Sequence, residues 1–345
     1  MNKIISKFFQ ELSYQTGQHF IQPTFLSLII TMKCNFRCQS CTIWQKEANA
    51  ELEEKDWLNI INKLNHELPA KTFVEINGGE PLIRKNLVLK IIRELKKHFE
   101  TVTLNTNGLL INEEMVEKLK NAGIDNIKLS FYSLSPETHN YLRGYSLAYE
   151  QAKKAIEIIN QKQVELEIGL LITAQNINEA PALIKFLQTL PKTKIILQPL
   201  DEKIESEESK FMADNKLPTD LWPNEKEVNN FFSWLMTNRK NIKNSLVNIK
   251  ALQEYYLKPS SVLKFRCFAG QRNLVIYPNG DTSFCFKMRP IGNVVQQELK
   301  KILKNASRER KVLKKCKKYC RIVGCNFSQG INEFISDKLT KKYDF

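Results

Sequence analysis

The sequence has no long run of uncharged apolar residues. The 345-residue chain contains no stretch of about 18 such residues, the length that suggests a membrane-spanning helix. Its amino terminus, MNKIISKFFQELSYQ, is interrupted by Glu11 and lacks the small-residue cleavage site of an export signal. We therefore expect a cytoplasmic protein that has no membrane partner.

Arginine is sparse relative to lysine, although the chain is strongly basic. Its net charge of +15 fits a nucleic-acid partner, acidic substrates or a lysine-rich surface. Lysine is spread along the whole chain, whereas planar, bidentate recognition of phosphate favours arginine. We therefore favour a lysine-rich surface over a nucleic-acid partner. The one local basic run, residues 300–321, ends in cysteines, and its charge could offset that of a thiolate-ligated cluster.

The eight cysteines gather in two groups, within residues 34–41 and 267–325. In the cytoplasm glutathione and thioredoxin keep thiols reduced, so clustered cysteines indicate a metal site or catalysis rather than disulfides. A chain of this length with 42% hydrophobic residues can bury one large core and a second small module.

Short β-branched runs alternate with longer helical patterns up to residue 200, which predicts six βα units and a parallel sheet. The strands are predicted over residues 25–31, 72–77, 101–106, 126–131, 164–173 and 194–199. The helices between them are predicted over residues 53–68, 86–99, 112–123, 149–161 and 177–190, with Gly123 as a helix stop. Periodicity alone does not distinguish an open doubly wound sheet from a barrel.

Unusual residues follow strand after strand at its carboxyl end. They are the cysteines after the first strand, NGGEP after the second, NTNG at the third and YSLSPETHNYLRG after the fourth. Barrel enzymes place their active sites at this edge of the sheet, so the loops favour a barrel.

The chain beyond residue 200 departs from the βα pattern. Residues 201–263 are predicted to form an acidic, proline-containing linker and two helices. Residues 264–345 are predicted to be a cysteine-rich module. It begins with a hairpin over 273–286, where the Asn-Gly-Asp order favours a tight turn. Residues 1–24 are left as an N-terminal extension.

Cys34, Cys38 and Cys41 follow the pattern C-x3-C-x2-C directly after the first predicted strand. A structural zinc site takes four protein ligands, and this loop holds no fourth cysteine or histidine. A cubane cluster has four irons, so three thiolates leave one iron open to an exogenous ligand. The number of thiols therefore favours an iron–sulfur cluster over zinc.

These motifs resemble those of the radical S-adenosylmethionine (radical SAM) superfamily, whose CxxxCxxC motif follows the first strand of a partial barrel. The resemblance covers residues 25–200. It implies a partial (β/α)6 TIM-like barrel, followed here by a small C-terminal α+β iron–sulfur module. It also implies a 4Fe-4S cluster on the three cysteines, and S-adenosylmethionine on the open iron, where reduction yields a 5′-deoxyadenosyl radical. The position before the last cysteine, often aromatic in the family, is Ser40, which would leave the adenine contact to Ile43 or Trp44.

The resemblance assigns further residues to the cofactor. They are Gly78, Gly79, Glu80 and Pro81 in NGGEP, Asn105 and Asn107 in NTNG, and Ser130 and Arg143 in the fourth loop. The glycine backbone would approach the methionine part, to whose ammonium Glu80 would pair. Ser130 would meet the ribose and Arg143 the carboxylate. Alternatively, NGGEP is a tight turn in which Pro81 opens a helix, and Arg143 is an ordinary surface cation.

The second group consists of Cys267, Cys285, Cys316, Cys320 and Cys325. Together with Gly280, five residues before Cys285, it resembles the C-terminal modules called SPASM and twitch, and the cysteines suffice for one auxiliary 4Fe-4S cluster. Four thiolates would saturate this cluster, and three would leave an iron open. We favour the first four as ligands, with Cys325 exchanging with a neighbour or remaining a free thiol. A zinc ribbon is the alternative.

We therefore expect a radical SAM enzyme, an oxidoreductase or modifying enzyme, that abstracts hydrogen from a small-molecule or peptide substrate. The auxiliary cluster would ligate the substrate or accept an electron from it. A further partner would be an electron donor such as flavodoxin or ferredoxin. The alternatives are a zinc-stabilised nucleic-acid-binding protein and an RNA-modifying radical SAM enzyme.

Overall fold

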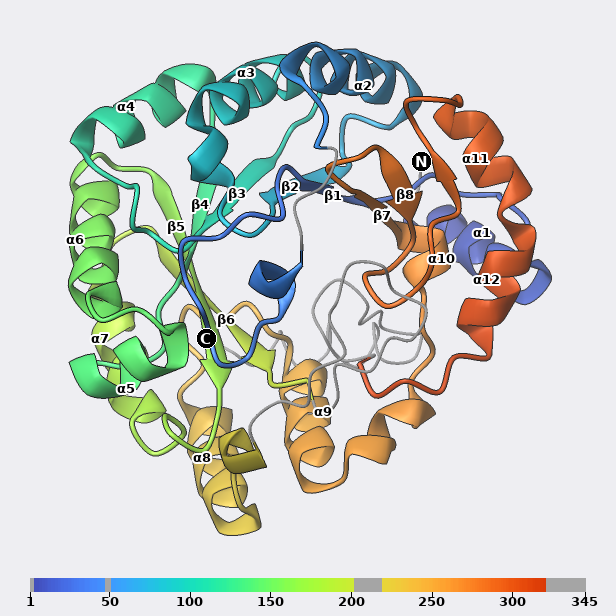
Figure 1. Ribbon diagram of the computed structural model, residues 1–345. Coiled ribbons are helices and arrows are strands. Elements are labelled where there is room, and N and C mark those ends of the chain that lie inside the picture. The colour runs from blue at the N-terminus through green and yellow to red at the C-terminus, as the bar shows by residue number, and fades with distance from the viewer. Residues whose placement is uncertain (1–2, 47–50, 202–218, 321–345) are drawn as a thin grey trace.

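The structure is a computed structural model that describes residues 3–46, 51–201 and 219–320. Its strands form one nine-stranded sheet in the order β6-β5-β4-β3-β2-β1-β7-β8-β9. The parallel part consists of β1 (Phe25–Ile29), β2 (Phe73–Asn77), β3 (Val102–Thr106), β4 (Asn126–Ser130), β5 (Glu165–Ile172) and β6 (Thr193–Pro199). These six strands curve around a central space, with helices outside (Figure 1). The predicted partial (β/α)6 TIM-like barrel is therefore confirmed.

The helices between the strands lie on the outer face of the sheet (Figure 1). They are α2 (Glu54–Glu67), α3 (Lys85–Leu95), α4 (Glu113–Ala122), α5 (Pro136–Arg143), α6 (Ala148–Gln161) and α7 (Ala180–Thr189). Two 3-10 turns, η1 (Ile43–Gln45) and η2 (Pro81–Arg84), follow β1 and β2. Gly123 ends α4, as predicted. None of the helices that the structure describes is long and apolar enough to cross a bilayer.

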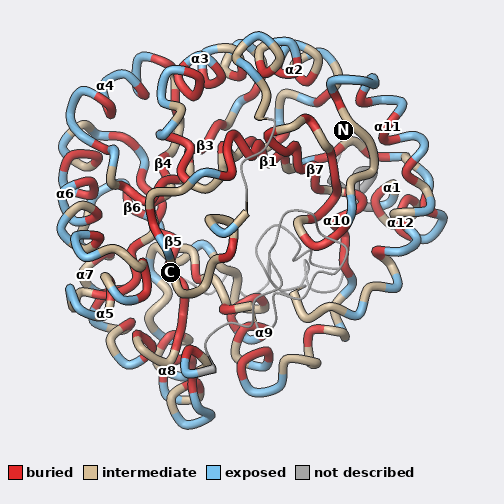
Figure 2. Tube along the Cα trace, in the orientation of Figure 1, coloured by how far each residue is buried: buried red, intermediate tan, exposed pale blue. Residues whose placement is uncertain are grey.

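Successive strand residues point to opposite faces of the sheet, and the two faces differ in polarity. On β2, Val74 and Ile76 are fully buried in the hydrophobic core, whereas the alternate residues Glu75 and Asn77 are only partly buried and carry polar groups. Figure 2 shows buried strands and exposed outer sides of the surrounding helices. The apolar face of the sheet thus packs under the helices, and the opposite, inner face carries polar side chains; we call the side of the sheet that this inner face borders the lumen.

The remaining described chain contains five helices, three short strands and two 3-10 turns. They are η3 (Thr219–Leu221), α8 (Glu225–Thr237), α9 (Leu246–Leu257), η4 (Pro259–Lys264), α10 (Ala269–Arg272), β7 (Asn273–Ile276), β8 (Asp281–Ser283), β9 (Gly292–Asn293), α11 (Leu299–Asn305) and α12 (Ser307–Lys314). The predicted hairpin is confirmed, because β7 and β8 pair antiparallel. Most of the predicted linker and Cys325 lie outside the described residues.

The hairpin does not stand apart from the barrel. Strand β7 pairs in parallel with β1, with Leu274 opposite Leu26, so the hairpin continues the barrel sheet. The predicted N-terminal extension contains α1 (Lys3–Thr16), which contacts α10 and α12. Arg266 donates two hydrogen bonds, at 2.7 and 2.8 Å, to the Glu11 carboxylate on α1. The two ends of the described chain therefore pack together beside β1.

Candidate active site at the carboxyl ends of the strands

The first cysteine group lies in the loop that follows β1. Cys34, Cys38 and Cys41 are half-buried free thiols, and the Cys41 amide donates to the Cys38 carbonyl at 3.2 Å. Burial, reinforced by the neighbouring Cys38 and Cys34, raises the pKa of the Cys41 thiol to about 12, although Arg143 acts in the opposite direction. The three sulfurs are thus close enough to interact. A cation that binds these sulfurs, such as a cluster iron, would stabilise the thiolates and displace their protons into solvent.

Arg143, the last residue of α5, lies beside these thiols. It is 7% exposed, so the reading of Arg143 as a surface cation is wrong. Its guanidinium stacks on the rings of Phe36 and Tyr132, 5.4 and 5.0 Å from their centroids, and donates to the Tyr132 hydroxyl at 3.0 Å. Burial would lower the pKa of Arg143, but Cys38 and its neighbours outweigh this effect and raise the pKa. A fixed positive charge therefore faces the cysteine loop, and its buried Nε has no partner within the described residues.

Two glycines allow other loops to touch the cysteine loop. A β-carbon at Gly79 would lie 2.2 Å from the Lys33 carbonyl oxygen, and one at Gly144 would lie 2.0 Å from that of Arg37. Gly144 also has a φ of +59°, which favours glycine. The backbones of NGGEP and of the α5 end are thus packed directly against the loop that carries the thiols.

Glu80 links the second and third motifs. Its carboxylate is fully buried and accepts hydrogen bonds from the Leu82 amide (3.0 Å), the Thr106 hydroxyl (2.9 Å) and the Asn107 amide (2.8 Å). Burial raises the pKa of Glu80, and these three donors partly offset the rise. Pro81 opens η2 with Glu80 as its cap, so the reading of NGGEP as a tight turn also holds.

Asn107 continues this link to the cysteine loop. Its side-chain amide donates to Oδ1 of Asn35 at 2.6 Å, and Asn35 lies between Cys34 and Cys38. Sequence reasoning missed Asn35, because its partner lies 72 residues away and only its place inside the cysteine motif marked it. The three motifs therefore form one hydrogen-bonded unit at the mouth of the barrel.

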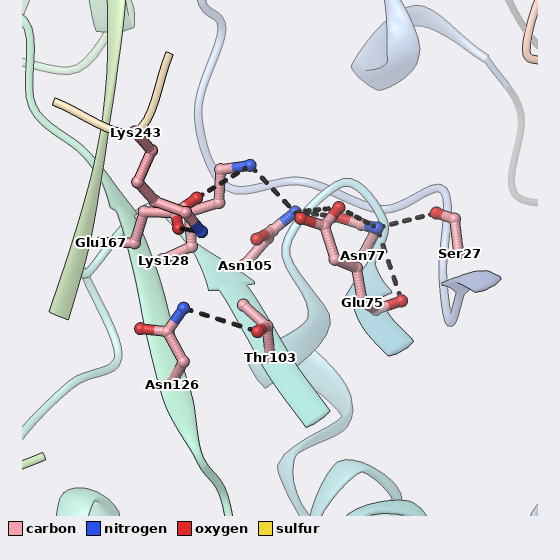
Figure 3. A network of polar contacts seen from close by, with 9 residues as sticks. All are labelled: Ser27, Glu75, Asn77, Thr103, Asn105, Asn126, Lys128, Glu167 and Lys243. Atoms are coloured by element: carbon pink, nitrogen blue, oxygen red, sulfur yellow. Dashed lines mark hydrogen bonds and ion pairs between the residues drawn. The ribbon is translucent and has the colours of Figure 1, made fainter. Parts of the chain in front are cut away.

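A network of charged and amide side chains spans the inner face of the sheet from β2 to β5 (Figure 3). The Lys128 ammonium on β4 lies 3.3 Å from Glu75 on β2 and 3.5 Å from Glu167 on β5. Glu167 also pairs with Lys243. Burial would lower the pKa of Lys128, but Glu75 and Glu167 outweigh it and raise the pKa. Lys128 therefore stays charged, held between two carboxylates.

The predicted residue Asn105 belongs to this network. Its amide contacts Asn77 and lies 3.4 Å from Glu75, while Asn77 donates to the Ser27 hydroxyl at 2.7 Å (Figure 3). Sequence reasoning missed the charged members, whose signal is the polar residue at every second strand position, as in VELEIG.

Ser130 ends β4, half-buried and opposite Gly169 on β5. A β-carbon at Gly169 would lie 3.4 Å from the Gln198 amide oxygen and 3.8 Å from the Lys128 side chain. Ser130, Gln198 and Lys128 thus share the neighbourhood of Gly169 on the inner face of the sheet.

The second cysteine group lies around the hairpin and after α12. Cys267 and Cys285 are buried, and Cys316 and Cys320 are half-buried. Burial raises the pKa of the Cys320 thiol, Lys287 opposes this rise, and Cys285 and Cys267 add to it. These interactions place three of the thiols near one another and near Lys287.

Lys287 also joins this group to the barrel. It pairs with Asp201, which directly follows β6 and Leu200, and its carbonyl accepts a hydrogen bond from Lys318 at 3.1 Å. Within the described residues, no three Cys, His, Asp or Glu side chains converge closely enough to hold a single metal ion. The thiolates of one cubane cluster bind separate irons and need not converge on one point.

Comparisons with known proteins match both cysteine groups. Residues 28–187 match the radical SAM superfamily, and residues 267–326 match SPASM, an iron–sulfur cluster-binding domain. The chain is 30% identical over 174 residues to the PqqA peptide cyclase of Granulibacter bethesdensis, covering 50% of this chain and 46% of that protein. It is 31% identical over 216 residues to a probable GTP 3′,8-cyclase of Methanococcus maripaludis, covering 62% of this chain and 70% of that protein. The chain thus spans about half the length of some curated relatives.

Solved structures share the fold. One is anSMEcpe with bound AdoMet, with a TM-score of 0.65 and 18% identity over 94% of this chain and 98% of that chain. Another is Streptococcus suis SuiB bound to the precursor peptide SuiA, with a TM-score of 0.63 and 18% identity over 86% of this chain and 67% of that chain. At such identity the likeness is one of fold alone.

Proposed function

The chain belongs to the radical SAM superfamily, and we propose from this that it uses a 5′-deoxyadenosyl radical to abstract a hydrogen atom from a substrate bound in the lumen. When bound, a 4Fe-4S cluster and S-adenosylmethionine supply this chemistry by reductive cleavage of a carbon–sulfur bond. The residues of the chain hold both groups, orient the substrate and keep water out.

One observation carries the proposal: the hydrogen-bonded unit that joins the three-thiol loop to NGGEP and NTNG. The thiols of Cys34, Cys38 and Cys41 are the donors that a cluster with one open iron requires. The close approaches at Gly78 and Gly79 leave bare backbone beside Thr31 and the thiol loop. We assign these glycines and the turn at Glu80 and Pro81 to the methionine part of the cofactor.

Arg143 and Ser130 complete the assigned cofactor site. The buried Arg143 guanidinium carries an unpartnered N–H, which suits a carboxylate of the cofactor better than a solvated surface position would. Ser130, at the carboxyl end of β4, is assigned to the ribose, and Asn105 and Asn107 to the wall between the thiol loop and the lumen.

We further propose that the lumen network holds the substrate. Ordinary barrel interiors are packed with branched apolar residues, and buried charges cost free energy of desolvation. Here Glu75 and Lys128 each keep 12% of their side chain exposed, so they remain accessible to a polar ligand. A substrate with amide or other polar groups, either a peptide or a small molecule, matches this wall.

The second group is proposed to hold one auxiliary 4Fe-4S cluster through Cys267, Cys285, Cys316 and Cys320. The match to an iron–sulfur cluster-binding domain over residues 267–326 supports this assignment. The cluster would ligate the substrate or accept its electron, and a carrier protein of the flavodoxin or ferredoxin type would exchange electrons with the enzyme.

Anaerobic reconstitution followed by reduction in the presence of S-adenosylmethionine tests the proposal. We expect about eight irons per chain, as two cubane clusters require, and formation of 5′-deoxyadenosine. The Cys38→Ala variant should lose this product, whereas Cys285→Ala should retain it and lose about half of the iron. If the wild-type protein carries both clusters but forms no 5′-deoxyadenosine, even slowly and without substrate, radical formation is contradicted. Equal loss of this product in both variants would contradict the assigned division of roles.

A further inference from the structure

Most of the excess positive charge of the protein lies on one short segment. Residues 299–318 contain ten lysines and arginines and one glutamate, a net charge of +9 out of +15 for the whole chain. An even spread of the 52 basic residues would place about three of them in such a segment. The expectation of an evenly spread lysine-rich surface therefore does not describe this region.

Seven of these cations form an exposed face on α11, α12 and the residues just beyond. We call them the α11–α12 face: Lys300, Lys301, Lys304, Arg308, Lys311, Lys315 and Lys317. The opposite sides of the two helices are buried, through Leu299, Ile302 and Leu313 among others. The outer sides of both helices are exposed in Figure 2. Helical spacing thus gathers the charges on the solvent side.

The charges of this face are not neutralised locally. Within the residues that the structure describes, none of the seven side chains forms an ion pair. On or just beyond the barrel helices, Lys90, Lys97 and Lys118 each pair with a glutamate. Concentrated like charge that is left unpaired creates a field that attracts an acidic partner and accelerates its encounter.

The α11–α12 face adjoins the second cysteine group. The amide of Cys316 donates to the Leu313 carbonyl at 3.1 Å, so this cysteine directly follows the last turn of α12. Lys315 and Lys317 flank it in sequence. A protein docked on this face would lie beside a proposed ligand of the auxiliary cluster.

We propose that the α11–α12 face docks an acidic one-electron carrier protein of the flavodoxin type, which exchanges one electron with the auxiliary cluster. This inference rests on the proposed function, which assigns a cluster to the second group. In the exchange the reduced carrier loses one electron and the cluster gains it, or the reverse, and no covalent bond forms or breaks. Lysine suits such a partner, because dispersed carboxylates need point charges rather than bidentate donors.

A nucleic acid fits the face less well. Residues 299–318 contain no aromatic residue on which a base could stack. Arg308 is the one exposed arginine of residues 299–318, since Arg310 is buried and stacks on Phe284 at 4.8 Å. The face therefore offers no ring for base stacking and only one guanidinium that can bind phosphate through two hydrogen bonds.

The test uses the reconstituted holoenzyme and reduced flavodoxin as the probe. The charge-reversed variant is Lys301→Glu/Lys304→Glu/Arg308→Glu. The matched control, Lys120→Glu/Lys153→Glu/Lys154→Glu, makes the same change in net charge on the exposed sides of α4 and α6. These helices lie across the barrel from α11 and α12 (Figure 1). Stopped-flow absorbance at low ionic strength measures cluster reduction by flavodoxin and, separately, by dithionite.

We expect flavodoxin-driven reduction to slow about tenfold in the charge-reversed variant and to stay near the wild-type rate in the control. Dithionite should reduce all three proteins equally, because it needs no docking face. Equal flavodoxin rates in all three proteins, or equal slowing in both variants, would overturn the proposal. Tighter binding of RNA than of flavodoxin, lost in the charge-reversed variant alone, would replace it with a nucleic-acid site.

The same experiment separates the two proposals. If dithionite reduces the clusters but no 5′-deoxyadenosine forms from S-adenosylmethionine in any protein, the proposed function fails. The flavodoxin rates would still decide whether the α11–α12 face docks the carrier.

Discussion

At the scale of single residues, Gly144 shows how tightly α5 is fitted to the cysteine loop. An alanine β-carbon there would meet the Arg37 carbonyl at 2.0 Å, and the φ of +59° would be strained as well. We expect Gly144→Ala to lower the free energy of unfolding by about 3 kcal/mol and to impair iron loading of the first group. Urea unfolding and iron analysis measure the two effects.

Gly169→Ala is the matched control, because its nearest neighbour would lie at 3.4 Å and its φ is ordinary. This variant should lose less than about 1 kcal/mol. If Gly144→Ala were as stable as Gly169→Ala and bound the same iron, the close approach of α5 to the loop would be refuted.

His139 provides a pH dependence. It is fully buried on α5, its Nδ1 accepts a hydrogen bond from the Tyr132 amide at 3.1 Å, and burial, assisted by Arg143, lowers its pKa from 6.5 to about 3. Between pH 3 and pH 6.5, His139 therefore binds a proton in the unfolded chain but stays neutral in the folded chain. Stability is fully present above pH 6.5 and is lost as the pH falls towards 3, by on the order of 5 kcal/mol in total.

His139→Asn keeps an acceptor for the Tyr132 amide and removes the titration. Urea unfolding between pH 7 and pH 4 should show a flatter profile for this variant. His66→Asn, a change of an exposed histidine on α2, should leave the profile unchanged. Parallel profiles for wild type and His139→Asn would show that His139 does not govern the acid sensitivity.

The site residues divide into those that a sequence can reveal and those that it cannot. The cysteines, NGGEP and NTNG carry recognisable spacing, and Arg143 was found through the LRG that follows them. Asn35 and Tyr132 carry no such mark, because they act through Asn107 and Arg143, which are distant in sequence or reached around a turn. Contacts between loops depend on how the chain packs, and a single sequence does not reveal this.

At the scale of elements, the six strands were predicted well, since each is short, apolar on one face and bounded by turn residues. Helix α5 was missed because its residues were taken as a loop motif. Its signal was nonetheless present, in Ser135 as the cap and Pro136 at the first helical position. The packing of α1 on α12 was also missed, because it joins the two ends of the chain.

The lumen network tests how neighbouring strands depend on one another. Lys128→Met removes the ammonium between Glu75 and Glu167, which leaves Glu75 without its ion-pair partner and Glu167 with Lys243 alone. We expect a loss of about 3 kcal/mol in the free energy of unfolding. The double variant Lys128→Met/Glu75→Gln should regain part of it, because the unpaired charge of Glu75 is gone. Urea unfolding at pH 7 measures this coupling.

Lys97→Met serves as the control, since Lys97 lies just beyond the end of α3 and forms an exposed ion pair with Glu94 on that helix. A surface pair contributes little, and the change should stay below about 1 kcal/mol. Additive effects of Lys128→Met and Glu75→Gln would mean that the two side chains do not interact, against the distance of 3.3 Å.

At the scale of the whole molecule, the two cysteine groups share a small hydrophobic cluster. Ile29, Met32, Val275 and Tyr277 are its buried members, and Ile43 and Phe286 pack against it. Ile43 lies two residues after Cys41, and Phe286 directly follows Cys285. The parallel pairing of β1 with β7 places these residues side by side. Both thiol loops therefore rest on one support.

Val275→Ala should weaken that shared support. Removing two buried methyl groups costs about 2 kcal/mol of unfolding free energy, and we expect iron to leave both groups faster under an iron chelator. Val88→Ala makes the same change at a fully buried site on α3, away from this cluster. It should lose similar stability while both groups release iron at rates closer to wild type. Because the support touches both loops, faster release from one group alone, or equal release rates in the two variants, would show that the cysteine groups are held independently.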